Sequence, residues 1–188
     1  MFKVVIDATP ITPMPSGVGL YLLNLIDALY KLQGSENFQL GLAYQPGFKN
    51  WLRRNFSLPE CLQNYTPQYQ LPLPTRVSNV ILDRFPQFFP NYLEPILDKP
   101  DLFHGTNYNT YPFRYPQKII NIYDLTFIKY PNYINSVVKQ YQKRVIKCLQ
   151  WSDLIITISE NCKKEIIDSF DVSPQKVWVT PLASRYSN

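Results

Sequence analysis

The chain has 188 residues, of which 45% are hydrophobic and 18% are charged. Disordered chains are poor in apolar residues and rich in charge, so this composition predicts one folded domain with a sizeable core. The formal net charge of +5 favours partners that carry phosphate or an anionic surface, although ordinary surface charge explains it equally well. No basic stripe with interleaved aromatic residues is present, which argues against nucleic acid as a partner.

The three cysteines are far apart in the sequence, and the chain has one histidine. This spacing is not that of a zinc site or a disulfide framework, so we expect no metal, no bound cofactor and a reducing compartment, the cytoplasm. No apolar stretch reaches the roughly 18 residues that span a bilayer. We therefore expect any membrane contact to be peripheral, at the inner face of the membrane.

Strands and helices alternate along the chain. Short apolar runs predict buried strands, and apolar residues at helical spacing predict amphipathic helices. The predicted strands are 3–8, 38–44, 101–106, 118–124, 154–159 and 177–179, and the long predicted helices are 19–32, 135–151 and 160–170. The alternation predicts an α/β fold, a Rossmann-like, doubly wound, mainly parallel sheet that binds ligands at the carboxyl ends of its strands.

The region between the second and third of these strands is rich in proline, and its pattern is weaker. We expect a short helix over 49–55, an extended segment over 65–73, a helix over 77–89 distorted by Pro86, and a short helix over 93–97.

The loop after the first strand, residues 9–19 (TPITPMPSGVG), leads directly into a helix. Glycines at a helix N-terminus let backbone N–H groups approach a phosphate, which the helix dipole also attracts. A dinucleotide fingerprint is disfavoured because Leu22 stands where its third glycine would fall. The alternative reading is that Gly17 and Gly19 only relieve crowding between helix and sheet.

Two further loops follow predicted strands and carry polar side chains. His104, Asn107 and Tyr108 lie in the first, where His104 is a candidate for acid/base chemistry or a packed loop residue. Asp124 lies in the second, where it is a candidate base or hydrogen-bond acceptor, or the cap of the following turn.

A last candidate group lies where the strand 154–159 meets a helix. Ser159 and Glu160 could present exposed N–H groups to phosphate or sugar oxygens, although helix capping alone explains both residues. Arg144, on the preceding helix, could reach the same crevice or belong to a solvated helix face.

Four stretches, taken in order, resemble the N-terminal domain of family 4 glycosyltransferases, which have the GT-B fold, and in particular the mannosyltransferase-like members. They are VVIDATPITPMPSGVGLYLLNLIDAL, DLFHGTNYNTYPF, KIINIYDLTFIKYP and WSDLIITISENCKKEIIDSFDVSPQKVWVTPLA. The resemblance covers residues 4–183. Many relatives have His-Asp-Leu where this chain has Tyr123-Asp124-Leu125, and a tyrosine cannot take the same proton role near neutral pH.

The resemblance implies a retaining, metal-independent transfer of a sugar from a nucleotide-sugar to a glycan or lipid-linked acceptor in polysaccharide biosynthesis. Residues 1–182 would be the acceptor-side domain and 183–188 the start of the interdomain linker. The C-terminal donor-binding domain would then come in cis or in trans, and the isolated domain would be inactive. The implied site is Ser16, Gly17, Val18 and Gly19 for donor phosphate, Asp124 and His104 for catalysis, and Asn107, Tyr108, Tyr123, Ser159, Glu160 and Arg144 for the acceptor.

A different class of function stays open. The chain could be a non-catalytic Rossmann-like module that binds a glycan, lipid or protein partner without a donor site. The tyrosine at position 123 favours this alternative, and so does the lack of a second domain among these residues.

Overall fold

The computed structural model describes residues 1–15, 17–129 and 136–183, and the side chains of residues 136–141 lie outside this description. Seven strands form one sheet, in the order β3-β2-β1-β4-β5-β6-β7, and each strand runs parallel to its neighbours. They are β1 Phe2–Asp7, β2 Phe38–Tyr44, β3 Gln68–Gln70, β4 Leu102–Gly105, β5 Gln117–Asn121, β6 Leu154–Thr157 and β7 Val177–Val179. The predicted α/β class with a parallel Rossmann-like sheet is confirmed.

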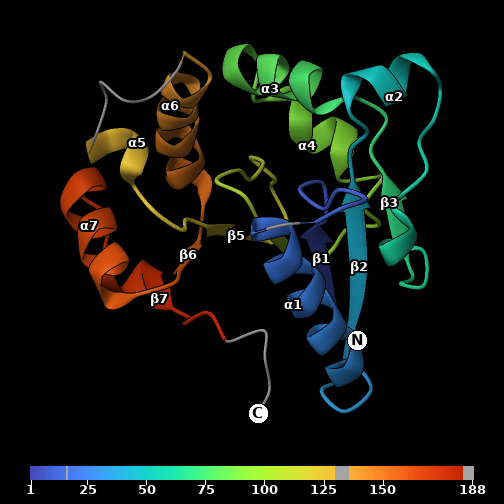
Figure 1. The fold of residues 1–188 in the computed structure, drawn as a ribbon, viewed down its shortest axis with the longest axis horizontal. Helices are drawn as coiled ribbons and strands as arrows, with labels where there is room; N and C mark the ends of the chain where they lie inside the picture. The colour runs from blue at the N-terminus through green and yellow to red at the C-terminus, as the bar shows by residue number, and fades with distance from the viewer. Residues whose placement is uncertain (16, 130–135, 184–188) are drawn as a thin grey trace.

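Helices cover both faces of this sheet (Figure 1). They are α1 Val18–Leu32, α2 Phe48–Leu52, α3 Thr75–Arg84, α4 Phe88–Leu93, α5 Thr126–Lys129, α6 Ser136–Trp151 and α7 Glu160–Phe170, with short 3₁₀ turns at Glu60–Leu62 and Pro174–Lys176. The chain order reverses between β1 and β4, which makes the carboxyl ends of these two strands a topological switch point.

The side chains of β1 show which helices lie on which face of the sheet. Val5 packs in a cluster with residues of α3 and α4, such as Leu82 and Phe89. The next residue, Ile6, packs in a second cluster with Leu22 of α1. Successive side chains of a strand point to opposite faces, so α1 covers one face and α3 and α4 the other.

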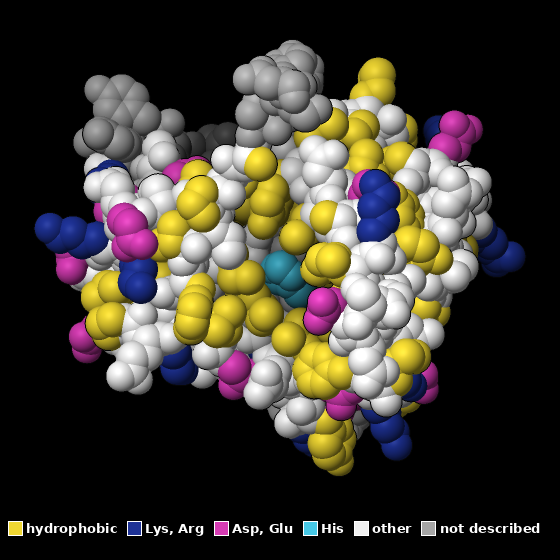
Figure 2. Space-filling model, turned by 90° about the horizontal axis from the view of Figure 1, so that it is seen from below, with side chains coloured by type: hydrophobic (Ala, Val, Ile, Leu, Met, Phe, Trp, Pro, Cys, Tyr) yellow, Lys and Arg dark blue, Asp and Glu magenta, His cyan; other side chains and the backbone are white. Residues whose placement is uncertain are grey.

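The face that α1 covers is less well packed beyond β4. On the opposite face, Ile120, Ile155 and Val177 are at most 1% exposed and pack with residues of α6 and α7. Their neighbours that point to the α1 face include Ile156, which is half-buried, and Trp178, which is 60% exposed. Figure 2 shows this side of the molecule, with hydrophobic side chains around the chain's one histidine.

The structure differs from the prediction in three places, two of them in the proline-rich region. The helix expected over 77–89 is two helices, because Phe85, which precedes Pro86, leaves the helical region at φ −141°. The short helix expected over 93–97 is wrong, since α4 ends at Leu93 and turns follow. α5, a single turn, was not predicted. Within the described residues, no helix is long and apolar enough to cross a membrane.

Candidate functional site

A chain of buried hydrogen bonds joins three adjacent strands at the switch point, and Thr106 is its junction. The Thr106 hydroxyl donates to the backbone carbonyl of Asp7 at 2.6 Å. The Thr106 carbonyl accepts from the Tyr123 hydroxyl at 2.5 Å. Asn121 donates through Nδ2 to the same tyrosine oxygen at 3.3 Å and lies 2.6 Å from His104 Nε2 through its Oδ1. The ends of β1, β4 and β5 are thereby held together by side chains as well as by the sheet.

This chain of bonds determines which nitrogen of His104 carries the proton. A backbone carbonyl only accepts, so the Tyr123 hydroxyl must donate its proton to Thr106. Its oxygen then accepts from the Asn121 amide nitrogen, which leaves the Asn121 carbonyl oxygen facing His104. His104 Nε2 must therefore be the donor of the 2.6 Å bond.

Burial makes both rings of this chain poor proton carriers near neutral pH. Burial lowers the pKa of His104, and the bond to Asn121 offsets only part of that shift. Burial also raises the pKa of Tyr123 well above that of a free phenol. Both groups are thus held in their neutral forms, as donors in a fixed geometry.

A second polar group lies at the same edge, on the α3 and α4 side of the sheet. Asp7 is 6% exposed, and its Oδ1 accepts from the backbone N–H of Thr9 at 3.0 Å. Burial raises the pKa of Asp7, and the contacts with Thr9 oppose that shift. Gln45, at the end of β2, accepts from the Tyr111 hydroxyl at 3.1 Å and donates to Ser78 of α3 at 2.8 Å.

Tyr108 and Asp124 form a pair at the mouth of this edge. The Tyr108 hydroxyl donates to Asp124 Oδ2 at 3.1 Å and accepts from the Asp124 backbone N–H at 3.0 Å. The other carboxylate oxygen accepts from the N–H of Thr126 at 2.9 Å, so Asp124 also caps the turn that begins α5. Asp124 is exposed and Asn107 is half-buried in the preceding loop.

The glycine loop approaches the site from the α1 side. Gly17 is the N-cap of α1, with φ +51° and ψ −115°, a conformation that side-chain-bearing residues rarely adopt. Gly19 is buried, and a Cβ there would lie 3.1 Å from Pro15 Cβ, so crowding explains this second glycine. Val18 begins the helix, and Ser16 lies outside the described residues.

A groove of about 610 Å³ runs beside the exposed end of this loop. Gly17 and Tyr21 line it on α1, and residues 180–183 line it on the far side. Tyr21 packs edge-on against Tyr123 with ring centroids 5.8 Å apart, so the groove borders the buried hydrogen-bond chain.

Of the remaining predicted residues, Ser159 and Glu160 lie near this edge of the sheet. Ser159 Oγ accepts from the Cys162 N–H at 3.1 Å and caps α7, with exposed Glu160 in the first turn. The Cys162 thiol donates to the Tyr123 carbonyl at 3.3 Å, which brings this helix end to the site.

Arg144, a residue of α6, lies instead near two buried side chains. Burial raises the pKa of the Cys148 thiol to about 12, and that of Tyr111 well above its usual value. The positive charge of Arg144 opposes both shifts, so it lies near these two side chains.

Sequence reasoning missed Asp7, Gln45 and Asn121. Each is a polar residue within or directly after an apolar strand, and each is at most 6% exposed. A carboxylate or amide at the end of an apolar strand is the sequence signal that could have identified them, because a buried polar group needs a hydrogen-bond partner.

No family model and no curated protein matches the chain. UDP-GlcNAc 2-epimerase from Neisseria meningitidis, bound to UDP-GlcNAc, is similar with a TM-score of 0.49 and 15% identity, over 96% of this chain and 46% of the epimerase. Heptosyltransferase WaaC from E. coli, with ADP, gives a TM-score of 0.34 and 12% identity, over 98% of this chain and 76% of that one. The chain thus spans about half the length of the epimerase.

Proposed function

We propose that this chain is the acceptor-side half of a GT-B glycosyltransferase, one that moves a sugar from a nucleotide-sugar to a glycan or lipid-linked acceptor with retention and without a metal. The observation that carries the proposal is the meeting of three of the quoted stretches at one edge of the sheet. Thr106 and Tyr123 share a hydrogen bond there, and Gly17 lines the adjoining groove. The family resemblance of those stretches supplies the reaction class.

The donor phosphates would meet the loop Ser16–Gly19. Gly17 has no heavy atom within 4 Å of the position of a Cβ, so its backbone faces open space on that side. Backbone N–H groups at the start of a 15-residue helix favour an anion there. The chain's formal net charge of +5 would add a weak attraction for a nucleotide diphosphate.

The acceptor would lie over the loops that follow β4 and β5. Asp124 is an exposed carboxylate at this edge, and we propose that it accepts a hydrogen bond from an acceptor hydroxyl while Tyr108 fixes its position. Asn107 and Ser159 would contribute further polar contacts. His104 would not contact the acceptor. It would fix the position of Asn121 and, through Asn121, that of Tyr123.

The other half of the cleft would come from a donor-binding domain in cis or in trans. An open half-cleft neither orients two substrates nor excludes water, so we expect this chain alone to bind ligands weakly and to turn none over.

Amide chemical shifts of the isotope-labelled chain test this assignment. Titration with UDP, GDP and ADP should shift the amides of Val18 and Gly19, and titration with hexoses and disaccharides should shift those of Asn107 and Asp124. Asp124→Asn should weaken only the second set, while Asp153→Asn, a carboxylate at the start of β6, is the matched control. Shifts confined to other surfaces would count against the proposal.

A non-catalytic binding module is the second candidate, and one observation favours it. His104 and Tyr123 are both buried, neutral and committed to hydrogen bonds within the protein. Neither is placed to move a proton. Nucleotide-sugar turnover after mixing with candidate partner chains separates the two functions, since only a half-enzyme gains turnover from a partner.

A further inference from the structure

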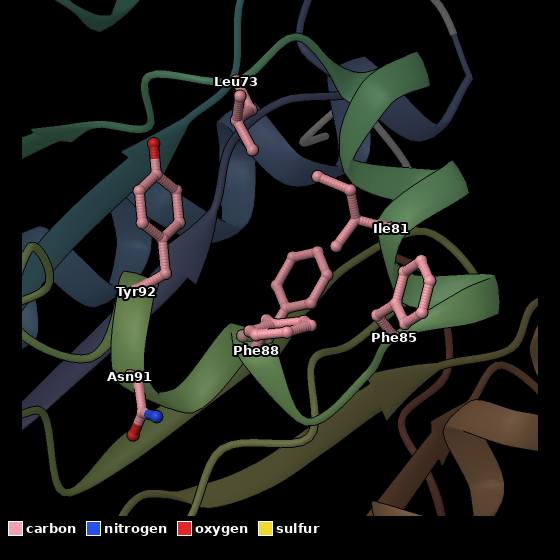
Figure 3. Close-up of a pocket in the computed structure, with 7 residues that line it drawn as sticks. Leu73, Ile81, Phe85, Phe88, Asn91 and Tyr92 are labelled. Carbon is pink, nitrogen blue, oxygen red and sulfur yellow. The ribbon is translucent and has the colours of Figure 1, made fainter.

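A groove with apolar walls lies between α3 and α4, on the face of the sheet opposite α1. It has a volume of about 560 Å³ and is lined chiefly by Leu73, Ile81, Phe85, Phe88, Phe89 and Tyr92. Figure 3 shows Ile81 and Phe85 on the α3 side, Tyr92 on the α4 side and Phe88 between them. The surface of the groove is therefore almost entirely apolar.

The rings at the rim of this groove are exposed. Phe88 is 58%, Phe85 50% and Tyr92 41% exposed. Phe85 and Phe88 pack edge-on with centroids 6.0 Å apart, so they form one projecting pair. Single exposed apolar residues are ordinary, but a contiguous aromatic patch beside a groove is typical of an interaction surface.

The apolar surface continues onto α2. Phe48 and Leu52 are exposed there, and Phe48 stacks on Trp51. The Trp51 ring donates to the Pro72 carbonyl at 2.9 Å, which ties α2 to the segment leading into α3. A smaller hollow is lined by Phe48 together with Arg76 of α3, so the two helix starts adjoin.

The same region has a positive net charge. Residues 48–93 hold five basic and two acidic residues, against a net +5 for the whole chain. The basic residues are Lys49, Arg53, Arg54, Arg76 and Arg84, and all are exposed. One of the two acids, Asp83, forms an ion pair with Lys147 of α6 at 3.8 Å.

We propose that this surface, formed by α2, α3 and α4, docks on a bilayer that contains anionic phospholipid. Exposed rings would insert at the level of the headgroups, where aromatic side chains are favoured, and the basic residues would meet lipid phosphates. Charge complementarity selects this occupant over a second copy of the chain, because two copies would bring the same excess of positive charge together.

The docking surface also adjoins the site. Phe89, the floor of the groove, stacks on Tyr111 with centroids 5.1 Å apart, and Tyr111 bonds to Gln45 at the switch point. A bilayer on α3 and α4 would therefore lie beside the carboxyl edge of the sheet. The docking itself does not depend on the proposed transferase function.

Co-sedimentation of the whole chain with vesicles tests the proposal without any nucleotide or sugar. Binding is measured to vesicles of phosphatidylcholine alone and of equal parts phosphatidylcholine and phosphatidylglycerol. We expect binding to the anionic vesicles only, and its loss at about 1 M salt, where the Debye length is about 3 Å.

Two pairs of variants separate the apolar and the charged contributions. Phe85→Ser with Phe88→Ser should lower anionic-vesicle binding at least about tenfold, since burial of one phenylalanine alone supplies that factor. Arg76→Gln with Arg84→Gln should lower it by about 25-fold, at about fivefold for each arginine. The controls, Tyr115→Ser with Trp178→Ser and Lys31→Gln with Lys164→Gln, change exposed residues outside this region and should bind as wild type.

Three results would overturn the proposal. They are absence of binding to anionic vesicles, equal loss in test and control variants, and a dimer in solution that the Phe85/Phe88 variant dissociates. The last would assign the surface to a second copy of the chain. A failure of nucleotide or sugar binding would leave the vesicle result unchanged.

Discussion

The Tyr123 hydroxyl donates to the Thr106 carbonyl at 2.5 Å, across the ends of two neighbouring strands. This bond closes the buried chain that runs from His104 through Asn121 to the backbone of Asp7. The bond therefore gives Tyr123 a structural role at this edge of the sheet.

Replacing Tyr123 by phenylalanine removes that bond without changing the shape of the ring. The Thr106 carbonyl and the Asn121 amide would lose a buried partner, so the free energy of unfolding should fall by about 1–3 kcal/mol. Urea unfolding measures this loss. Tyr115→Phe is the control, because Tyr115 is 76% exposed, and it should change stability by less than about 0.5 kcal/mol. Equal effects of the two variants would remove the structural role.

His104 predicts a pH dependence of stability. Its pKa in the folded protein is lowered by burial, so below about pH 6.5 the unfolded chain takes up a proton that the folded protein excludes. Stability should therefore fall as the pH drops through about 6.5, and the loss should end at the lowered folded-state pKa. The difference in unfolding free energy between wild type and His104→Gln, followed from about pH 8 to about pH 5, should shrink toward acid. A constant difference over this range would show that His104 does not titrate as inferred.

Gly105 allows two backbone segments to touch. A Cβ at this residue would lie 1.9 Å from the carbonyl oxygen of Asn109, a contact with backbone and not with a flexible side chain. We expect Gly105→Ala to cost at least about 3 kcal/mol and to loosen the loop that carries Asn107. Gly34→Ala, where the added Cβ meets open space, should change stability by less than about 1 kcal/mol in the same urea experiment. A tolerated Gly105→Ala would mean that this loop can move away at little cost.

Much of the fold could be predicted from the sequence because buried parallel strands have a strong local pattern. Runs such as residues 154–159 are largely apolar, and Ser159 predicts the start of the helix that follows. The site was only partly predictable. The pairing of His104 with Asn121 depends on strand register, which no local pattern specifies. The exposed aromatic residues of α3 and α4 could not be told from core residues in the sequence. The local pattern of a helix does not specify which of its apolar faces is left uncovered in the fold.

We expect the Asp7 carboxylate to lower the stability of the folded protein. A buried carboxylate with a raised pKa is costly to keep charged, so Asp7→Asn should raise the free energy of unfolding at pH 7 by about 1 kcal/mol. If the carboxylate serves the proposed sugar transfer, the same change should lower that transfer in cell extracts. Thermal unfolding and transfer, measured on one preparation, test both parts. A variant that is destabilised would show that the charge is compensated in the folded protein.

We propose that the Gly17 loop and the switch-point edge belong to a sugar-transfer site. The most direct measurement is transfer of labelled hexose from UDP-, GDP- and ADP-sugars into glycan or lipid by extracts of cells that make the protein. The extracts would carry wild type, Gly17→Val or the matched Gly34→Val at equal protein levels. We predict that Gly17→Val loses transfer by about 100-fold, since its φ of +51° does not suit valine and a shift of about 1 Å suffices for such a loss, while Gly34→Val keeps it. Undiminished transfer with Gly17→Val, or transfer that does not depend on the protein, would show that the Gly17 loop does not belong to such a site.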